Sequence, residues 1–458
     1  MKKTFCVAVF VAVSMFVTAV CFGAAAPKQV NAPVVTKKPL PTFTPVPSAP
    51  VVPTGPGIPL PKPMIQVSTG FRHACAISAA NILWCWGRNL SGELGIGESA
   101  PGHYKVLLPV PVGTAADKYI SVAAGGFHTC AVKGDRSLWC WGDNRYGQVG
   151  LGLGAEYAAV AYVPKRIGSD TDWAKVIAGT NHSCGLKTDG SLYCWGLNYR
   201  GQVGVVTPDR NRNGVVGDDN EYSPVSVSVS DKWVAVAAGE EHTCAIKNAS
   251  GYPIYCWGRN PFGQLGNGYA GSDEDEFEPR KVLGTNKWAF VAAGGDHTCA
   301  INRDVRELYC WGRDNFGQLG NGHDVTEDMT APHEVSGEGE WRSVSAGRFN
   351  TCGIKTDGFL YCWGDDNYGQ LGDGDTLTDV CNAPRKIMES VKWDSVSAGN
   401  AFACGVTQDN KLYCWGNNSE GQLGINSTVD QTVPTEVTLA LSRVPRSDRD
   451  YGAPIPIR

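Results

Sequence analysis

The sequence lacks an excess of positive charge. It contains 40 Lys and Arg against 45 Asp and Glu, which gives a formal net charge of −5. Proteins that neutralise nucleic-acid phosphates need clustered basic residues. We therefore expect no nucleic-acid partner for this chain.

Catalytic signatures are missing as well. The chain has no glycine-rich phosphate loop, no nucleophile-elbow serine and no HExxH sequence. We expect a protein that is not an enzyme and that uses no cofactor, with calcium as the one exception weighed below.

The amino terminus has the order of segments found in a secretory signal. Met1, Lys2 and Lys3 precede an apolar run over residues 5–22, and small residues follow it. This order predicts a signal peptide over residues 1–26. The run is also near the ~20 residues that span a bilayer, so an uncleaved amino-terminal anchor is the alternative. Either way we expect a secreted, periplasmic or cell-surface protein that meets the membrane only through such an anchor.

Residues 27–63 contain twelve prolines and no acidic residue. A segment so rich in proline cannot form a helix or a central strand. It predicts an extended, semi-rigid linker. Such a linker serves as a stalk if the protein is anchored, and as a disordered leader if the signal is cleaved.

A Cys-Trp-Gly triplet recurs seven times at spacings of 52 to 62 residues, and a Gly-Gln-Leu-Gly-like turn follows each copy. Three-residue turns such as Thr188-Asp189-Gly190 separate two short alternating segments in each copy, which is typical of a hairpin. A tryptophan upstream opens a further strand in five copies, and a Pro-x-x-Val/Ile sequence marks a fourth. Four strands per repeat predict one blade of a β-propeller.

We therefore predict an all-β, seven-bladed propeller with four-stranded blades over residues 64–441, followed by a tail over residues 442–458. Copy seven is followed by an apparent surplus strand over residues 434–439. We expect this carboxy-terminal strand to complete blade one and so close the ring.

The sevenfold pattern of Ala-Gly, His-Thr, Trp-Gly and Gly-Gln-Leu-Gly resembles the regulator-of-chromosome-condensation (RCC) repeat family. It also resembles the secreted bacterial branch that contains beta-lactamase inhibitory protein II. The resemblance implies a seven-bladed propeller but no single function. Chromatin binding and nucleotide exchange, known for the founding member, conflict with a signal sequence. Photoreception, known for a plant member, relies on a Gly-Trp-Arg-His-Thr motif, and the nearest string here, residues 70–74, is Gly-Phe-Arg-His-Ala.

Fourteen cysteines form seven pairs at one place in each repeat, ten to twelve residues apart. With a three-residue turn, the partners at a separation of ten face each other across the hairpin at disulfide distance. Seven disulfides agree with an oxidising compartment. The predicted pairs are Cys75–Cys85, Cys130–Cys140, Cys184–Cys194, Cys244–Cys256, Cys299–Cys310, Cys352–Cys362 and Cys404–Cys414, which leaves Cys381 without a partner.

Histidine recurs at one repeat position, at residues 73, 128, 182, 242 and 297, with Asn350 and Phe402 in the other two copies. A ring of imidazoles is compatible with metal binding. A phenylalanine in the series is incompatible with a ligand role and compatible with packing. We expect these histidines to be structural.

The longest connection, in copy three, has oxygen side chains at alternate positions before a glycine, as a calcium loop requires. The alternative is a merely hydrophilic insertion, because position twelve of the loop is Asn220 and not glutamate. The candidate ligands are Asp209, Asn211, Asn213, the Val215 carbonyl, Asp219 and Glu221.

Acidic residues also gather in the equivalent connections of later copies, and we expect the propeller to present them on one rim. Solvated loop charge is the simplest explanation, but a shared acidic rim steers a basic partner. The candidate rim residues are Asp273, Glu274, Asp275, Glu276, Asp324, Asp328, Asp373 and Asp375.

The chain is thus expected to be a monomeric, extracytoplasmic scaffold that binds a protein partner through its inter-blade loops. The alternatives are an adhesion or envelope-structural protein on a proline-rich stalk, an inhibitor of a secreted enzyme, and a glycan-binding or hydrolytic propeller. The last would require acidic pairs that line the central channel.

Calcium binding is directly testable by titration calorimetry. We expect the wild-type protein to release or absorb heat with calcium, and the Asp209→Ala variant to lose that signal because a first ligand is removed. Absence of heat from both proteins rejects the site.

Overall fold

The computed structural model describes residues 58–59, 64–97, 104–153, 158–207, 219–323, 327–375 and 380–439. These residues all belong to the second of two compact units, which spans residues 53–458. The predicted signal peptide over residues 1–26, most of the linker over residues 27–63 and the tail over residues 442–458 lie outside the described residues.

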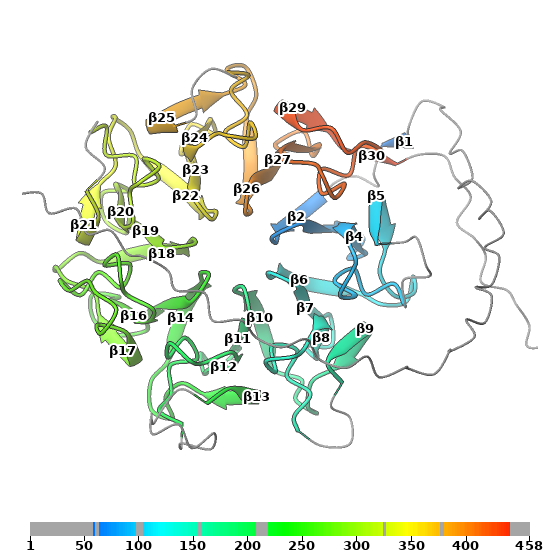
Figure 1. Cartoon of the computed structure of the whole chain (residues 1–458), viewed down its shortest axis with the longest axis horizontal. Helices are drawn as coiled ribbons and strands as arrows, with labels where there is room; N and C mark the ends of the chain where they lie inside the picture. Colours follow the sequence, from blue (N-terminus) through cyan, green and yellow to red (C-terminus); the bar gives the residue numbers. More distant parts are fainter. Residues whose placement is uncertain are drawn as a thin grey trace, which may run out of the picture. The chain divides into compact units, whose positions relative to one another are not determined.

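The described residues form seven antiparallel four-stranded sheets arranged as the blades of a ring (Figure 1). The all-β, seven-bladed prediction is confirmed. The innermost strand of each blade opens with a buried tryptophan, tyrosine or methionine that packs on its own blade. These strands are β2 (Met64–Thr69), β6 (Tyr119–Ala124), β10 (Trp173–Ala178), β14 (Trp233–Ala238), β18 (Trp288–Ala293), β22 (Trp341–Ala346) and β26 (Trp393–Ala398).

The two middle strands of each blade carry one cysteine each, and both cysteines are fully buried. The second strands are β3 (His73–Ser78), β7 (His128–Lys133), β11 (His182–Lys187), β15 (His242–Lys247), β19 (His297–Asn302), β23 (Asn350–Lys355) and β27 (Phe402–Thr407). The third strands are β4 (Leu83–Arg88), β8 (Leu138–Asp143), β12 (Leu192–Gly196), β16 (Ile254–Gly258), β20 (Leu308–Gly312), β24 (Leu360–Asp365) and β28 (Leu412–Gly416).

Disulfides join the two middle strands in every blade. Cys184 faces Cys194 directly, for example, and their Cα atoms lie 4.1 Å apart. The separations of eleven and twelve in blades five and four are accommodated by longer hairpin turns. Cys381, on the outer strand of blade six, is the free cysteine of the described residues.

The outermost strand of each blade contains a proline, which has no N–H to donate and is therefore tolerated at a sheet edge. These strands are β5 (Lys105–Pro111), β9 (Val160–Arg166), β13 (Glu221–Ser226), β17 (Glu276–Lys281), β21 (Met329–Glu334), β25 (Val380–Ile387) and β29 (Gln431–Glu436). A bulge at the Trp-Gly step offsets each outer strand from its neighbour, as between Cys194 and Gly196.

The predicted mode of ring closure is wrong. The carboxy-terminal strand β29 belongs to blade seven, where it pairs with β28, and blade one takes all four of its strands from residues 64–111. The reason is that Met64–Thr69 is itself an inner strand, so each of the seven copies supplies a complete blade and no strand is left over. A short β30 (Thr438–Leu439) pairs instead with β1 (Ile58–Pro59), which lies within the predicted linker.

Side-chain hydrogen bonds between blades close the ring. The Trp86 indole N–H of blade one donates to the carbonyl of Gln422 in blade seven at 2.8 Å. Each of the other six blades makes the same bond to the blade before it, from Trp141, Trp195, Trp257, Trp311, Trp363 and Trp415. Blades one and seven also share one apolar core, which includes Met64, Trp86, Phe402 and Leu423.

The recurring histidines also join neighbouring blades. The His182 Nε2 atom lies 2.9 Å from the Thr243 hydroxyl of the next blade, and that hydroxyl donates to the Gln202 carbonyl at 2.8 Å. Because the hydroxyl proton is used for the carbonyl, the imidazole Nε2 must be the donor. The buried His182 Nδ1 has no hydrogen-bond partner, so a proton there would be left unpaired, which favours the neutral ring. The same contact links His73, His128, His242 and His297 to the following blade.

Burial lowers the pKa of these five histidines, to about 4 for His128 and about 3 for the others. A histidine in the unfolded chain takes up a proton near pH 6.5, whereas the folded chain resists protonation until the pH reaches the lowered value. Stability is therefore complete above pH 6.5 and falls as the pH drops toward 4.

We predict that acid sensitivity decreases when one histidine is removed. Each buried histidine contributes a slope of up to about 1.4 kcal/mol per pH unit below pH 6. His182→Asn imitates blade six, which has Asn350 at this position. In urea unfolding from pH 7 to pH 4.5, the variant should lose less free energy of unfolding than the wild type. Parallel pH profiles for the two proteins would contradict this prediction.

Candidate functional site

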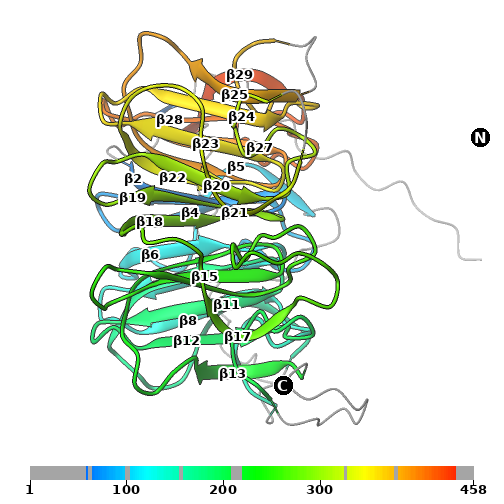
Figure 2. The same ribbon diagram turned by 90° about the vertical axis from the view of Figure 1, so that its left-hand side faces the viewer.

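The strands run across the thickness of the ring, so every connection lies on one of two faces (Figure 2). One face, which we call the loop face, carries the connection between the first and second strands and the long connection between the third and fourth strands. In blade one these are residues 70–72 and 89–104. The opposite face carries the hairpin turns and the links between blades. Every predicted calcium and rim residue belongs to a long connection or to the start of the outer strand that follows it.

The long connections share one rigid turn. In each blade an Asn or Asp oxygen accepts a hydrogen bond from the backbone N–H five residues later, as Asn260 accepts from Leu265 at 3.0 Å. The last glycine of the Gly-Gln-Leu-Gly sequence has a positive φ and lies against the tryptophan of the next blade. A Cβ atom on Gly266 would lie 2.6 Å from the Trp311 indole nitrogen, so only glycine fits. The turn therefore holds the intervening residues in fixed positions.

Aromatic side chains occupy those fixed positions. Tyr146 and Tyr368 are 38% and 47% exposed at the position before the first glycine of the turn, and Phe262 and Phe316 stand there in blades four and five. In blade three Tyr199, which is 41% exposed, stands one position earlier. The short connections nearer the axis add Phe71, Phe127 and Phe349, of which the first two pack edge to face with ring centroids 5.6 Å apart.

Arginines stack between these rings. The Arg313 guanidinium lies 4.8 Å from the Phe262 ring centroid and 5.3 Å from that of Phe349. Arg348 lies 4.9 Å from the Phe349 centroid, and Arg88 lies 4.9 Å from that of Phe127. Arg313 and Arg88 contact rings of neighbouring blades, so their cation–π contacts join the blades on this face. Arg348 stacks on the next residue of its own connection.

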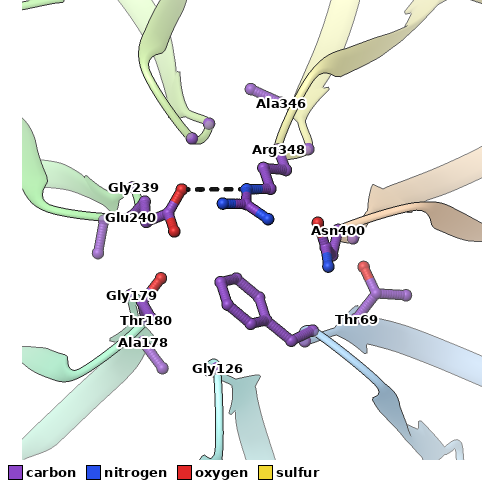
Figure 3. Close-up of a pocket in the computed structure, with 18 of the residues that line it drawn as sticks. Thr69, Gly126, Ala178, Gly179, Thr180, Gly239, Glu240, Ala346, Arg348 and Asn400 are labelled. Carbon is purple, nitrogen blue, oxygen red and sulfur yellow. Dashed lines mark ion pairs between the residues drawn. The ribbon is translucent and has the colours of Figure 1, made fainter. Parts of the chain in front are cut away.

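Carboxylates of the same blade or of another blade neutralise most of these arginines. Arg348 pairs with Glu240 at 3.3 Å across the central opening (Figure 3). Asp296 pairs with both Arg259 and Arg313, and Glu241 pairs with Arg259 at 3.4 Å. The loop face thus combines exposed aromatic rings with a network of alternating charges over blades four to six.

The central opening on this face is too narrow for a metabolite. Its lining consists of the Ala-Gly step of every blade and the next residue, which include Thr180, Glu240, Arg348 and Asn400 (Figure 3). Its volume is about 80 Å³. Cavities that hold small organic ligands measure roughly 300 Å³ or more. The one acidic side chain in this lining, Glu240, is paired with Arg348, so the opening does not present the acidic pair expected of a hydrolytic propeller.

The candidate rim residues differ in their surroundings. Asp273 and Glu274 are exposed. Asp275 pairs with Arg200 at 3.1 Å, Glu276 pairs with Arg280 at 2.8 Å, and Asp373 and Asp375 both pair with Arg385. Asp328 accepts the Asp314 backbone N–H, and Asp324 lies outside the described residues. Four of the eight candidate rim residues are therefore paired with arginines.

The candidate calcium loop is described only at its base. Asp209, Asn211, Asn213 and Val215 lie outside the described residues. The Asp219 backbone N–H donates to the Thr207 hydroxyl at 3.1 Å, and Glu221 opens β13 and is 7% exposed. Within the described ranges no group of three or more His, Cys, Asp or Glu side chains is placed to hold a metal ion.

Sequence reasoning missed the aromatic and arginine centre of the loop face. These residues lie immediately before the histidine and immediately after the Trp-Gly step, at positions that differ from copy to copy. The position before the histidine holds Arg72, Phe127, Asn181, Glu241, Asp296, Phe349 and Ala401. The sequence signal that could have indicated these residues is their variability at fixed positions of an otherwise constant repeat.

Two carboxyl groups replace the usual asparagine of the rigid turn. Burial raises the pKa of Asp314 to about 6 and that of Asp366 to about 7, and Asp373 and Asp365 add to the effect at Asp366. Asp366 accepts the Leu371 N–H at 2.9 Å and is only 6% exposed. A protonated carboxyl group at this position keeps a neutral side chain where the other blades have a neutral amide.

No helix in the part of the chain that the structure describes is long and apolar enough to cross a membrane.

Family models match most of the propeller. The RCC1-like domain model matches residues 205–448, slightly more than half of the chain. Models of the regulator-of-chromosome-condensation (RCC1) repeat match residues 64–93, 81–132, 119–148, 135–186 and 173–202.

Similar proteins include the ultraviolet-B receptor UVR8 of Arabidopsis thaliana, 28% identical over 82% of this chain and 81% of that protein. The regulator of chromosome condensation of Xenopus laevis is 28% identical over 74% of this chain and 81% of that protein. The human E3 ubiquitin-protein ligase HERC2 is also 28% identical, but this chain covers only 7% of its length.

Solved structures share the fold. Yeast RCC1 (Prp20) bound to Kap60 is similar with a TM-score of 0.67 and 24% identity, over 78% of this chain and 83% of that one. Human WBSCR16 is similar with a TM-score of 0.66 and 23% identity, over 78% and 94% of the two chains.

The raised pKa of Asp366 predicts that the free energy of unfolding decreases as the pH rises. The folded chain keeps its proton up to about pH 7, whereas the unfolded chain loses it near pH 3.8, so stability is full below pH 3.8 and declines as the pH rises to 7. We expect Asp366→Asn to raise the free energy of unfolding by about 1–2 kcal/mol at pH 8 and by much less at pH 4. Asp314→Asn, with a smaller shift, is the matched comparison. An equal effect of Asp366→Asn at both pH values would rule out this cause.

Proposed function

The chain belongs to the family of RCC1-like domains, and on that premise we propose that it is an extracytoplasmic protein-binding propeller whose recognition surface is the loop face. The observation that carries the proposal is the set of exposed tyrosines and half-buried phenylalanines and arginines on the connections of this face.

Tyrosine, tryptophan and arginine dominate the residues that contribute most to protein–protein binding. They bury a large area at a small cost in side-chain entropy when the scaffold holds them in place. Tyr146 and Tyr199 are fixed by the turn, in which the following Gln side chain accepts a hydrogen bond from the backbone near the tyrosine. Preorganised side chains lose little freedom on binding, which favours affinity.

The proposed location rests on the cysteines and on the amino terminus. Seven disulfides, one per blade, favour an oxidising compartment over the cytosol. The expected signal over residues 1–26 agrees with export. On this basis we place the chain in the secreted bacterial branch of the family, and a secreted or envelope protein is the natural partner.

The names of similar proteins fit a binding role. The yeast structure contains RCC1 bound to Kap60, and a second yeast structure is named for binding of Prp20p to Gsp1p and histones. For the present chain the partner is a different one, because its net charge of −5 provides no basic surface for chromatin. We propose binding without catalysis, by a monomer. Calcium, if bound, would be held by residues 209–221.

Crosslinked affinity capture from the native envelope tests the proposal. The double variant Tyr146→Ser, Tyr199→Ser removes two exposed rings of the loop face and should reduce capture of the major partner at least tenfold. The control Val229→Ser, Val305→Ser removes two exposed apolar side chains of the opposite face. Capture that falls only with the control would assign recognition to that face.

The acidic rim is tested in the same assay. Asp273→Asn with Glu274→Gln removes the two exposed rim charges while it leaves the paired carboxylates intact. If the rim steers a basic partner, this variant should slow association, and high salt should remove the difference. Unchanged association at low salt would reject the rim.

A further inference from the structure

The loop face contains a second hollow, at the junction of blades seven and one. Its volume is about 300 Å³, and it is lined by Phe71, Arg72, Tyr368, Asn400, Ala401 and Asn417 among others. We call it the junction pocket. Unlike the central opening, it is large enough for an amino-acid side chain or a small ligand.

The junction pocket exists because blade seven lacks the side chains that fill the same place elsewhere. In blade five the residue after Trp-Gly is Arg313, which pairs with Asp296 and stacks on Phe262 and Phe349. In blade seven the corresponding residues are Asn417 in place of Arg313 and Ala401 in place of Asp296. A partly buried ion pair is thus replaced by two shorter side chains, which leaves a gap.

The walls of the pocket favour a negatively charged guest. Arg72, in the place of Phe349, is 51% exposed, and its ion pair with Glu420 is 3.5 Å long. Among the described residues, the other arginines of the loop-face connections all have a carboxylate at 3.3 Å or closer. A guanidinium offers five N–H donors in a fork that matches a carboxylate, and Arg72 uses few of them.

A second cation lies beside the pocket. The Lys105 ammonium donates to the backbone carbonyl of Ser419, a lining residue, at 3.0 Å. In the described ranges no carboxylate lies within ion-pair distance of Lys105. Glu420 is therefore the one acidic group that balances Arg72 and Lys105, and the local charge is positive.

We infer that the junction pocket binds the carboxylate of a glutamate or aspartate side chain on the partner, with Arg72 as the bidentate donor. The Phe71 and Tyr368 rings would cover the apolar stem of the guest. This inference rests on the proposed function, because it names the chemical group that the loop face receives. A free small carboxylate has the same chemistry and is the other source to distinguish.

Saturation-transfer NMR on the full, oxidised protein tests the site with defined probes. The probes are acetyl-Ala-Glu-Ala-amide, the matched acetyl-Ala-Gln-Ala-amide, and free glutarate. We expect transfer to the Glu peptide that is at least fivefold stronger than transfer to the Gln peptide and that falls in high salt. Equal transfer to the two peptides would overturn the carboxylate assignment. Transfer to glutarate alone would overturn a partner side chain as the source.

Two variants locate the binding. Arg72→Gln removes the donor, and Ala401→Phe fills the pocket with the residue that blades two and six have at this position, at Phe127 and Phe349. Both should reduce transfer to the Glu peptide at least fivefold. Arg166→Gln, which removes an exposed arginine of the opposite face, should not. Thermal unfolding confirms that each variant folds. Wild-type transfer in both pocket variants refutes the site.

The capture assay separates this inference from the proposed function. If Tyr146→Ser, Tyr199→Ser abolishes capture while Arg72→Gln leaves it unchanged, the loop face is the recognition surface and the junction pocket is not its anchor. If Arg72→Gln reduces capture at least tenfold and also abolishes transfer to the Glu peptide, the pocket anchors the partner.

Discussion

The fold depends on one hydrogen bond repeated around the ring, from the tryptophan indole N–H of each blade to a loop carbonyl of the blade before it. The carbonyl belongs to Glu93 in blade one and to a glutamine in each of the other six blades. The indole is fully buried, so an unmade bond would cost roughly 1–3 kcal/mol. The last glycine of the Gly-Gln-Leu-Gly turn must lack a side chain, because the indole ring of the next blade lies against it. Trp-Gly and Gly-Gln-Leu-Gly recur together because each supplies one half of the same contact.

This contact also fixes the loop face. The loop whose carbonyl accepts this bond carries the aromatic residue in blades two to six, so the contact that closes the ring also positions these side chains on the loop face. The buried hydrogen bonds between a histidine and a threonine form a second contact between neighbouring blades, as between His182 and Thr243. Disulfides act within blades and strengthen hairpins, whereas the polar bonds between blades hold the ring together.

Much of this could be predicted from the sequence because the information is local. Facing cysteines, hairpin turns and edge prolines follow from spacings within one repeat, and seven copies of that repeat imply a ring. The closure error had a simple origin: the segment over residues 434–439 was treated as a surplus strand, although most of it belongs to β29, the outer strand of blade seven itself. The long-range ion pairs could not be predicted. Asp275 meets Arg200 and Asp296 meets Arg259 across blade boundaries, and no spacing in the chain encodes which carboxylate an arginine reaches. An acidic rim deduced from loop composition alone therefore overstates the charge that a partner would meet.

The same reasoning explains where a repeat protein of this kind acquires specificity. The tryptophan and the turn glycine that form the contact between blades are the same residue types in all seven copies, so these positions carry no information about the partner. Positions beside them vary freely, and in blades four to six they satisfy one another, as Arg259, Arg313 and Asp296 do. Where the series is interrupted, at Ala401 and Asn417, a gap is left, and Arg72 lines it in the place of Phe349. An arginine with one long ion pair at the edge of such a gap, on a scaffold too rigid to collapse into it, gains more from a second carboxylate on another molecule than from rearrangement of its own chain.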